Sequence, residues 1–229
     1  TTGGALAAGA RADGVPVIPL PGGFAPRAAV GYALVVALEV AALTGAGEGL
    51  RTEIDVAAEH AERLLAEWGP DAPEDSLAKR VARSLSQTTP QIAGAGLTAP
   101  IAYRWKTQIN ENANSPCFAA ELPELDHNEI VGWEGAAALG RFSAVLLDDC
   151  DLHPRVRARI GLTLDVIAEQ GAAATHRIES RGVAPVERLV SLVALGDLVS
   201  FYMAILAGRD PVAIAPIDRL KAELAQQAT

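Results

Sequence analysis

The chain is poor in cysteine and in aromatic side chains. Its two cysteines, Cys117 and Cys150, show no CxxC spacing and have no histidine pair nearby. This pattern argues against a disulfide scaffold and against a structural zinc site, and we interpret both as reduced thiols of a folded core. Aromatic residues make up 4% of the 229 residues, whereas half of the residues are hydrophobic. The sequence therefore predicts a sizeable core that is mostly aliphatic.

Positive charge is also scarce. Lysine and arginine number 19 against 28 aspartate and glutamate residues, which gives a net charge of -9. Nucleic acid and anionic membranes would be repelled by such a chain, so we expect neither as a partner. A phosphorylated metabolite is not excluded, because a local basic residue or a helix N-terminus can hold a phosphate.

The most apolar run, residues 28–43, contains Glu39 and is shorter than the ~20 residues that span a bilayer. We predict a helix of a soluble core there, no signal peptide and a cytoplasmic protein. The chain opens on TTGG and its only methionine is Met203. We therefore expect it to be a processed or truncated form of a longer protein.

Several catalytic motifs are absent. The chain has no GxSxG motif and no GxGxxG followed by a downstream acid, which argues against a serine hydrolase and a dinucleotide site. No HxxE or HxH spacing accompanies His127, so a metal site in its surroundings is disfavoured and no cofactor is expected.

The pattern that is present alternates strands with helices. Such alternation predicts right-handed βαβ units and a mainly parallel sheet. A turn-rich segment at 69–75 is the candidate link between two subdomains, 1–75 and 76–229. The expected strands are 15–20, 91–95, 117–122, 142–147 and 172–178, and the expected helices are 28–43, 53–68, 76–86, 100–113, 153–170, 185–206 and 217–225, with an irregular or briefly helical loop at 123–133.

Residues 110–133 form an unusually polar stretch in this aliphatic chain. Glu111 falls near the C-terminal end of a predicted helix, where the helix dipole disfavours the ionised form of a carboxyl group. Such a position would suit a general base, whose pKa needs to be raised toward neutrality. The alternative is an ordinary exposed glutamate. His127 lies among acidic residues that favour the imidazolium, a proton donor. Its alternatives are a capping or solvated histidine and, third, a metal ligand. In GAGLTAP, Gly94 and Gly96 either admit an anion to the backbone or serve a turn for steric reasons.

Three stretches carry a family resemblance: RWKTQINENANSPCFAAELPELDHNEIVGW at 104–133, GVPVIPLPGGFAPRAAVGY at 14–32, and residues 195–224. Together they resemble the bifunctional phosphoglucose/phosphomannose isomerases of the sugar isomerase (SIS) superfamily. The resemblance implies a three-layer αβα sandwich with mainly parallel sheets and tandem subdomains, the first incomplete here. It also implies an enzyme that converts glucose 6-phosphate or mannose 6-phosphate to fructose 6-phosphate through a cis-enediol, without metal or nucleotide.

The resemblance also implies roles for individual residues. Glu111 of the NENA motif corresponds to the catalytic base, and His127 of ELDHNE to a ring-opening residue that comes from the neighbouring subunit of a homodimer. Lys221 is a second candidate for ring opening, and Arg27 is expected near the enediolate. As substrate-binding residues we predict Thr1, Thr2, Gly3, Gly94 and Gly96.

Three departures from the family pattern leave a second hypothesis open. Asn114 follows NENA where the family usually has lysine, and Val212 stands where it often has threonine. The family's serine- and threonine-rich phosphate loop is expected upstream of Thr1. The alternative to an isomerase is therefore a non-catalytic SIS-type module that binds a sugar phosphate or a partner.

Overall fold

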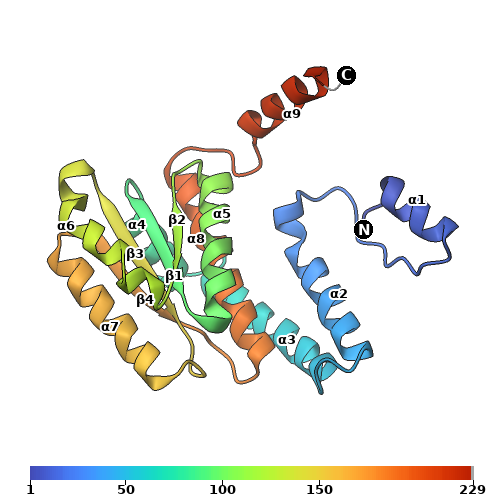
Figure 1. Ribbon diagram of the computed structural model, residues 1–229, viewed down its shortest axis with the longest axis horizontal. Helices are drawn as coiled ribbons and strands as arrows, with labels where there is room; N and C mark the ends of the chain where they lie inside the picture. Colours follow the sequence, from blue (N-terminus) through green and yellow to red (C-terminus); the bar gives the residue numbers. More distant parts are fainter. Residues whose placement is uncertain (228–229) are drawn as a thin grey trace. The chain divides into compact units, whose positions relative to one another are not determined.

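The computed structural model describes residues 1–227, which belong to two compact units. The first unit covers Thr1–Ala58 and the second begins at Glu59. The first contains α1 (Gly4–Ala12), η1 (Pro26–Ala29), α2 (Val30–Leu43) and the start of α3 (Leu50–Trp68), which continues into the second (Figure 1). The subdomain boundary that we place at residue 75 stays a prediction.

The strand predicted at 15–20 is wrong. These residues belong to no helix or sheet, and Pro16 and Pro19 lack the amide hydrogen that a strand ladder needs. Instead, the amide of Leu20 donates to the carbonyl of Thr1 at 2.9 Å. Helix α1 was not expected either, because its alanine- and glycine-rich sequence buries only Ala7 and has no apolar stripe to reveal a helix.

The second unit is built on a four-stranded, fully parallel sheet in the order β2-β1-β3-β4. Its strands are β1 (Thr89–Gly94), β2 (Phe118–Glu121), β3 (Phe142–Asp148) and β4 (Ala174–Glu179). Ile92 of β1 pairs with Ala119 of β2 and Val145 of β3, which sets the register. The two central strands are almost continuously buried, as expected for a parallel sheet covered on both faces.

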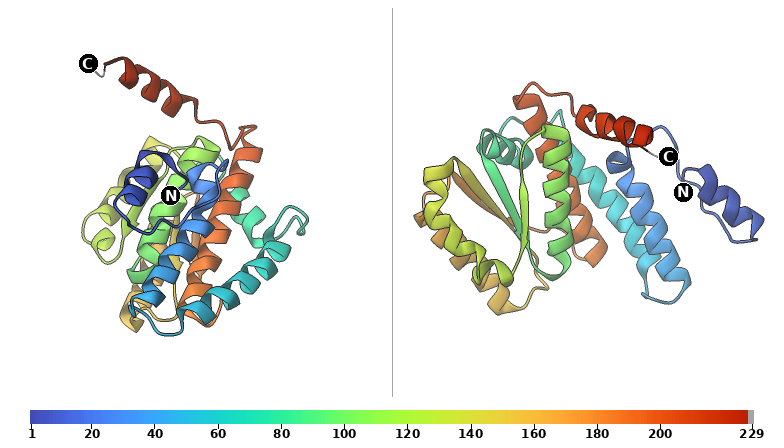
Figure 2. Two further views of the ribbon diagram at one scale, coloured as in Figure 1. Left: turned by 90° about the vertical axis from the view of Figure 1, so that its right-hand side faces the viewer. Right: turned by 45° about the horizontal axis from the view of Figure 1, so that its top comes forward.

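Alternate residues of the central strands supply two separate cores, which gives three layers. Ile92 and Val145 point toward α3, α4 (Leu77–Leu85), α5 (Ala99–Ala113) and α8 (Pro185–Leu206). Their neighbours Ala93 and Ala144 point toward α6 (Glu129–Leu139) and α7 (Pro154–Glu169). Figures 1 and 2 show the sheet between these two helical layers. The predicted αβα sandwich is confirmed.

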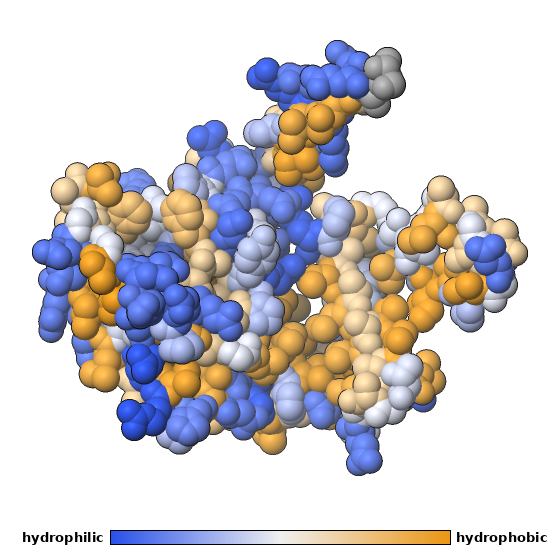
Figure 3. Space-filling model, in the orientation of Figure 1, coloured by the Kyte–Doolittle hydropathy of each residue, from blue (hydrophilic) through white to orange (hydrophobic). Residues whose placement is uncertain are grey.

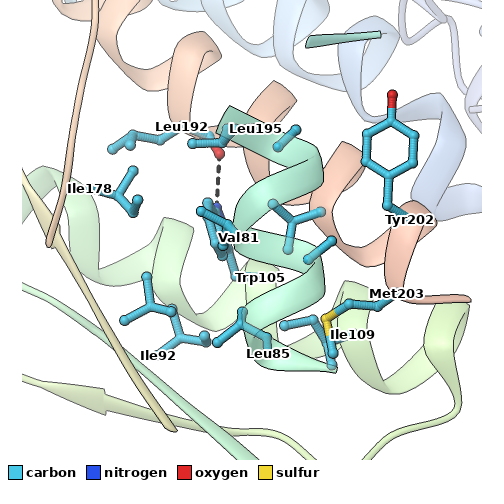
Figure 4. Close-up of a cluster of buried hydrophobic side chains, with 14 of the residues drawn as sticks. Val81, Leu85, Ile92, Trp105, Ile109, Ile178, Leu192, Leu195, Tyr202 and Met203 are labelled. Atoms are coloured by element: carbon cyan, nitrogen blue, oxygen red, sulfur yellow. Dashed lines mark hydrogen bonds between the residues drawn. The ribbon is translucent and has the colours of Figure 1, made fainter. Parts of the chain in front are cut away.

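The core beneath α4, α5 and α8 is centred on Trp105. This side chain is fully buried, and its indole Nε1 donates to the carbonyl oxygen of Leu192 on α8 at 2.8 Å (Figure 4). Aliphatic side chains such as Val81, Leu85 and Ile109 fill the space around it. The aliphatic core predicted from composition is therefore present, with one tryptophan that ties two helices together.

Most predicted helices of the second unit are confirmed, and α8 has the predicted bounds. The last helix is α9 (Ala215–Gln227). The main differences lie in 117–139. The strand is shorter than predicted and lies at the sheet edge, where Phe118 is 57% exposed. The loop contains η3 (Glu124–Asp126) and then enters α6, which has apolar residues on all sides and buries only Trp133, so no helical stripe revealed it.

Among residues 1–227, two helices are long and apolar enough to cross a membrane by length and composition alone: Pro26–Leu43 and Pro185–Leu206. Half of the most apolar window of the second is buried, as in the core helix of a soluble domain. The first has no buried residue and exposes Tyr32, Val35 and Leu43, and α2 accordingly shows as an orange surface in Figure 3. One or two such helices are weak evidence for a membrane span.

Candidate active site

Glu111 lies in the last turn of α5 and is partly buried. Two features end the helix just beyond it. Asn114 adopts the left-handed conformation (φ 51°, ψ 40°), which asparagine tolerates better than most residues. The side-chain amide nitrogen of Asn110 donates to the backbone carbonyl of Ser115 at 2.9 Å and so closes the turn. The departure Asn114 thus has a local explanation as the residue that terminates α5.

His127 lies in the turn between β2 and α6 and is exposed. Its backbone amide donates to the carbonyl of Glu124 at 2.9 Å. The carboxylate of Glu124 accepts from the Asn128 side chain at 2.8 Å, and Asn128 in turn caps the amide of Glu129. These bonds fold the turn locally and leave the imidazole on the surface.

Two anchors connect this turn to the body of the unit. Leu125 is fully buried under the sheet. The carboxylate of Asp126 accepts from the Thr163 hydroxyl at 2.7 Å and from Arg159 at 3.2 Å, both on α7. The acidic residues around His127 therefore hold the turn in place, a use that their density in the sequence did not indicate.

The glycines of GAGLTAP occupy the turn after β1. A Cβ at Gly94 would lie 2.4 Å from the carbonyl oxygen of Thr98, so only glycine fits. Gly96 has a positive φ of 51°. The Thr98 hydroxyl accepts from the Ala95 amide at 2.9 Å and folds the loop back on itself. The steric interpretation accounts for both glycines, and anion binding by this loop stays a prediction.

Within one chain, Glu111 and His127 lie at opposite ends of the parallel strands. Gly94 ends β1, and the amide of Leu122, just before the His127 turn, donates to its carbonyl at 2.9 Å. Gly94, Gly96 and His127 thus all lie at the carboxyl ends of the strands. Glu111 sits at the far end of α5, which runs back for about 20 Å at 1.5 Å per residue. Within one chain, the length of α5 therefore separates Glu111 from His127.

The other predicted site residues are less enclosed. Lys221 lies on α9, which has no buried residue. In the first unit, Arg27 lies in η1 and is partly buried. Thr1, Thr2 and Gly3 lead into α1, and the Thr1 hydroxyl accepts from the Gly3 amide at 3.2 Å.

Among residues 1–227, one group has the spacing of a metal site: ligand atoms of Asp149, Cys150 and Asp151 lie within 4.8 Å of one another. Both carboxylates bind the buried guanidinium of Arg188 instead, Asp149 at 3.0 Å. Burial works to raise the pKa of Asp149, but hydrogen bonds from Ser180 and the Asp151 amide, together with Arg188, hold it below its usual value. The group is accounted for as an ion-pair cluster.

Sequence comparison places these residues in a family. Residues 74–224 match the family model of the bacterial phospho-glucose isomerase C-terminal SIS domain. The chain is 39% identical over 99% of its length to a bifunctional phosphoglucose/phosphomannose isomerase from Caldicellulosiruptor bescii, and 32% identical over its full length to the protein of the same name from Aquifex aeolicus. The chain belongs to the bifunctional phosphoglucose/phosphomannose isomerase family. It spans 67% of each of these relatives, about two thirds of their length.

Solved structures agree with the fold of this isomerase family. A glucose-6-phosphate isomerase-like protein from Thermus thermophilus superposes with a TM-score of 0.62 at 23% identity, covering 86% of this chain and 62% of that one. Tagatose-6-phosphate ketose/aldose isomerase from Escherichia coli superposes with a TM-score of 0.60 at 17% identity, covering 91% of this chain and 59% of its own. At these identities the likeness supports the SIS-type fold.

A buried ion-pair network that was not expected from the sequence lies at the carboxyl end of β3. Asp148 has no exposed surface, and its carboxylate accepts from Arg157 and Arg177 at 2.6–3.2 Å. Burial opposes its charge, yet these bonds hold the pKa of Asp148 below its usual value. The run DDCD at 148–151, directly after a predicted strand, was the available signal. The network ties the end of β3 to α7, which carries Arg157, and to β4, which carries Arg177.

Proposed function

We propose that the complete protein interconverts glucose 6-phosphate or mannose 6-phosphate with fructose 6-phosphate. The observation that carries this proposal is the 39% identity over 99% of the chain, together with intact NENA and ELDHNE stretches at 110–113 and 124–129. The comparisons do not favour a non-catalytic module. Because this chain spans 67% of the Caldicellulosiruptor bescii relative, the activity is a proposal for the complete protein.

In this proposal Glu111 transfers the proton. Its carboxylate takes the proton from C2 of the open aldose while the C1 carbonyl oxygen gains a proton, which yields the cis-enediol. Glu111 then returns its proton to C1 as the C2 hydroxyl gives up its own, which leaves the ketose. The enediolate that precedes full protonation carries negative charge, and Arg27 is the cation proposed to stabilise it.

Ring opening is assigned to His127 and Lys221. One group must protonate the ring oxygen and another must take the proton of the anomeric hydroxyl. Because Glu111 and His127 lie at opposite ends of the parallel strands in one chain, we propose that His127 serves the active site of a second subunit. A symmetric homodimer would then contain two composite sites. We also propose that the enzyme works in the cytoplasm.

The test is Glu111→Gln in the complete protein, with Glu169→Gln as the control, because Glu169 is an exposed glutamate at the end of α7. Loss of the base should lower kcat for glucose 6-phosphate by about 10²–10⁴-fold, whereas calorimetry should still detect binding of fructose 6-phosphate. The control should retain wild-type turnover. Unchanged turnover in Glu111→Gln would contradict the assignment. A wild-type protein that binds the sugar phosphate but does not turn it over would favour a non-catalytic module.

A further inference from the structure

The helix that carries Glu111 is tied to α8 along one polar row. Arg104, Gln108 and Asn112 are spaced four residues apart and therefore lie on one face of α5. The carboxylate of Asp197 on α8 accepts from Arg104 at 2.6 Å and from Gln108 at 3.0 Å. The row thus makes two contacts with α8 before it reaches the turn that contains Glu111.

The third contact of the row lies beside Glu111. Asn112 is buried, and its side-chain amide nitrogen donates to the Ser200 hydroxyl at 2.9 Å. That hydroxyl is itself fully buried and donates its own proton to the carbonyl of Asp197 at 2.8 Å. Its lone pair is therefore the acceptor for Asn112, and the direction of both bonds is defined.

The position of this bond matters because the end of a helix is its least constrained turn. The last four carbonyls of a helix lack helical partners, and this turn frays most easily. Glu111 lies within it, three residues before Asn114 ends the helix. Asn110 closes the following turn onto Ser115, and Asn112 binds α8. The two asparagines of NENA therefore hold the backbone on both sides of the glutamate.

Stability alone gives little reason for this polar row. Burial raises the pKa of Asp197 above its usual value, despite Arg104 and Gln108, so the fold does not favour its charge. The Arg104–Asp197 pair is partly buried, with side chains 17% and 32% exposed. An ion pair withdrawn from water is often no more stabilising than apolar residues of the same volume, and its best-attested use is to set one register between packed elements. Here the register in question decides where the end of α5 lies.

We propose that Asn112 and Ser200 are positioning residues of the isomerase, which hold the last turn of α5 so that the Glu111 carboxylate meets the substrate carbon. This inference rests on the proposed function. A misplacement of a catalytic group by about 1 Å can lower a rate by as much as 10²-fold, so one buried hydrogen bond in this turn is enough to matter.

The test is Ser200→Ala in the complete protein, with Ser191→Ala as the matched control. Ser191 is also a buried serine of α8, and its hydroxyl makes the same two bonds: it donates to the carbonyl three residues earlier, at 2.7 Å, and accepts one N–H, from Arg181 at 2.8 Å. Both variants should unfold at slightly lower temperature. Only Ser200→Ala should lower kcat, by about 10-fold to 10²-fold with little change in KM.

A double variant separates positioning from general damage. If Ser200 acts through Glu111, then adding Ser200→Ala to Glu111→Gln should leave the residual turnover unchanged. Asn112→Ala is the second variant, since it removes the same bond from the other helix and should give the same loss of kcat. Circular dichroism at the assay temperature should show each protein folded.

Three outcomes would overturn the inference: an unchanged kcat in both Ser200→Ala and Asn112→Ala, an equal loss in Ser191→Ala, or a further loss in the Glu111→Gln background. Each of them leaves the proposed function standing as long as wild type turns over and Glu111→Gln lowers kcat by about 10²-fold or more. Wild type without turnover would instead remove the proposed function itself.

Discussion

Gly196→Ala tests how closely α5 and α8 pack. A Cβ at Gly196 would lie 2.2 Å from Nε1 of Trp105, 2.4 Å from its Cδ1 and 2.5 Å from its Cε2. The indole is fully buried and bonded to Leu192, so it has little room to turn aside. To restore the separation of about 3.5–4.0 Å that non-bonded carbon atoms prefer, the ring or a helix must move by roughly 1–2 Å.

The magnitude follows from three opposing effects. Alanine gains about 1 kcal/mol over glycine in a helix interior. Overpacking a core costs about 1–3 kcal/mol, and a buried indole N–H that loses its acceptor costs about 1–3 kcal/mol more. Taken together, these effects should make Gly196→Ala lower the free energy of unfolding by about 1–5 kcal/mol.

The assay is urea unfolding followed by tryptophan fluorescence. All three tryptophans, Trp68, Trp105 and Trp133, belong to the second unit, so the signal reports on it. Gly135→Ala is the control, because Gly135 lies on the exposed surface of α6 with no atom within 4 Å of its Cβ position. The control should gain up to about 1 kcal/mol. A Gly196→Ala midpoint at or above that of wild type, with an unchanged slope, would refute the close packing.

Two further predictions concern histidines. Burial, helped by Arg80, lowers the pKa of His176 below 6.5, so as pH falls through that value the unfolded chain binds a proton that the folded chain does not. Stability should therefore fall more between about pH 7.5 and pH 5.5 in wild type than in His176→Gln, and equal losses in urea midpoints would contradict this. For the composite site, mixed and exchanged subunits of Glu111→Gln and His127→Ala should recover turnover, since some dimers then hold one intact site. If both residues of a site came from one chain, no activity would return.

Much of the second unit could be predicted from local pattern. The runs 91–95 and 142–147 are apolar because central parallel strands are covered on both faces, and this signal needs no long-range information. The segment at 15–20 looked similar, but its prolines keep it out of a ladder. Helix α6 was missed because apolar residues on all its sides leave no stripe to detect.

The candidate site was predicted unevenly for a related reason. The quoted motifs identified the family and the residues Glu111 and His127, because those matches depend on residue identity alone. The partners that hold them were not predictable: Asn112 meets Ser200 across 88 positions, and Asp126 meets Thr163 across 37. Such pairs depend on how helices pack, and no periodicity records that.

The sequence by itself determined the alternation of strands and helices, and with it the parallel sheet, because hydrophobic periodicity is a local property of the chain. It also determined family membership. Only the tertiary structure decided that Glu111 and His127 lie at opposite ends of the parallel strands, since this follows from the direction in which α5 returns from β1 to β2. It also decided that the asparagines beside Glu111 bind α8 and the next turn, because their partners come near only when the helices pack.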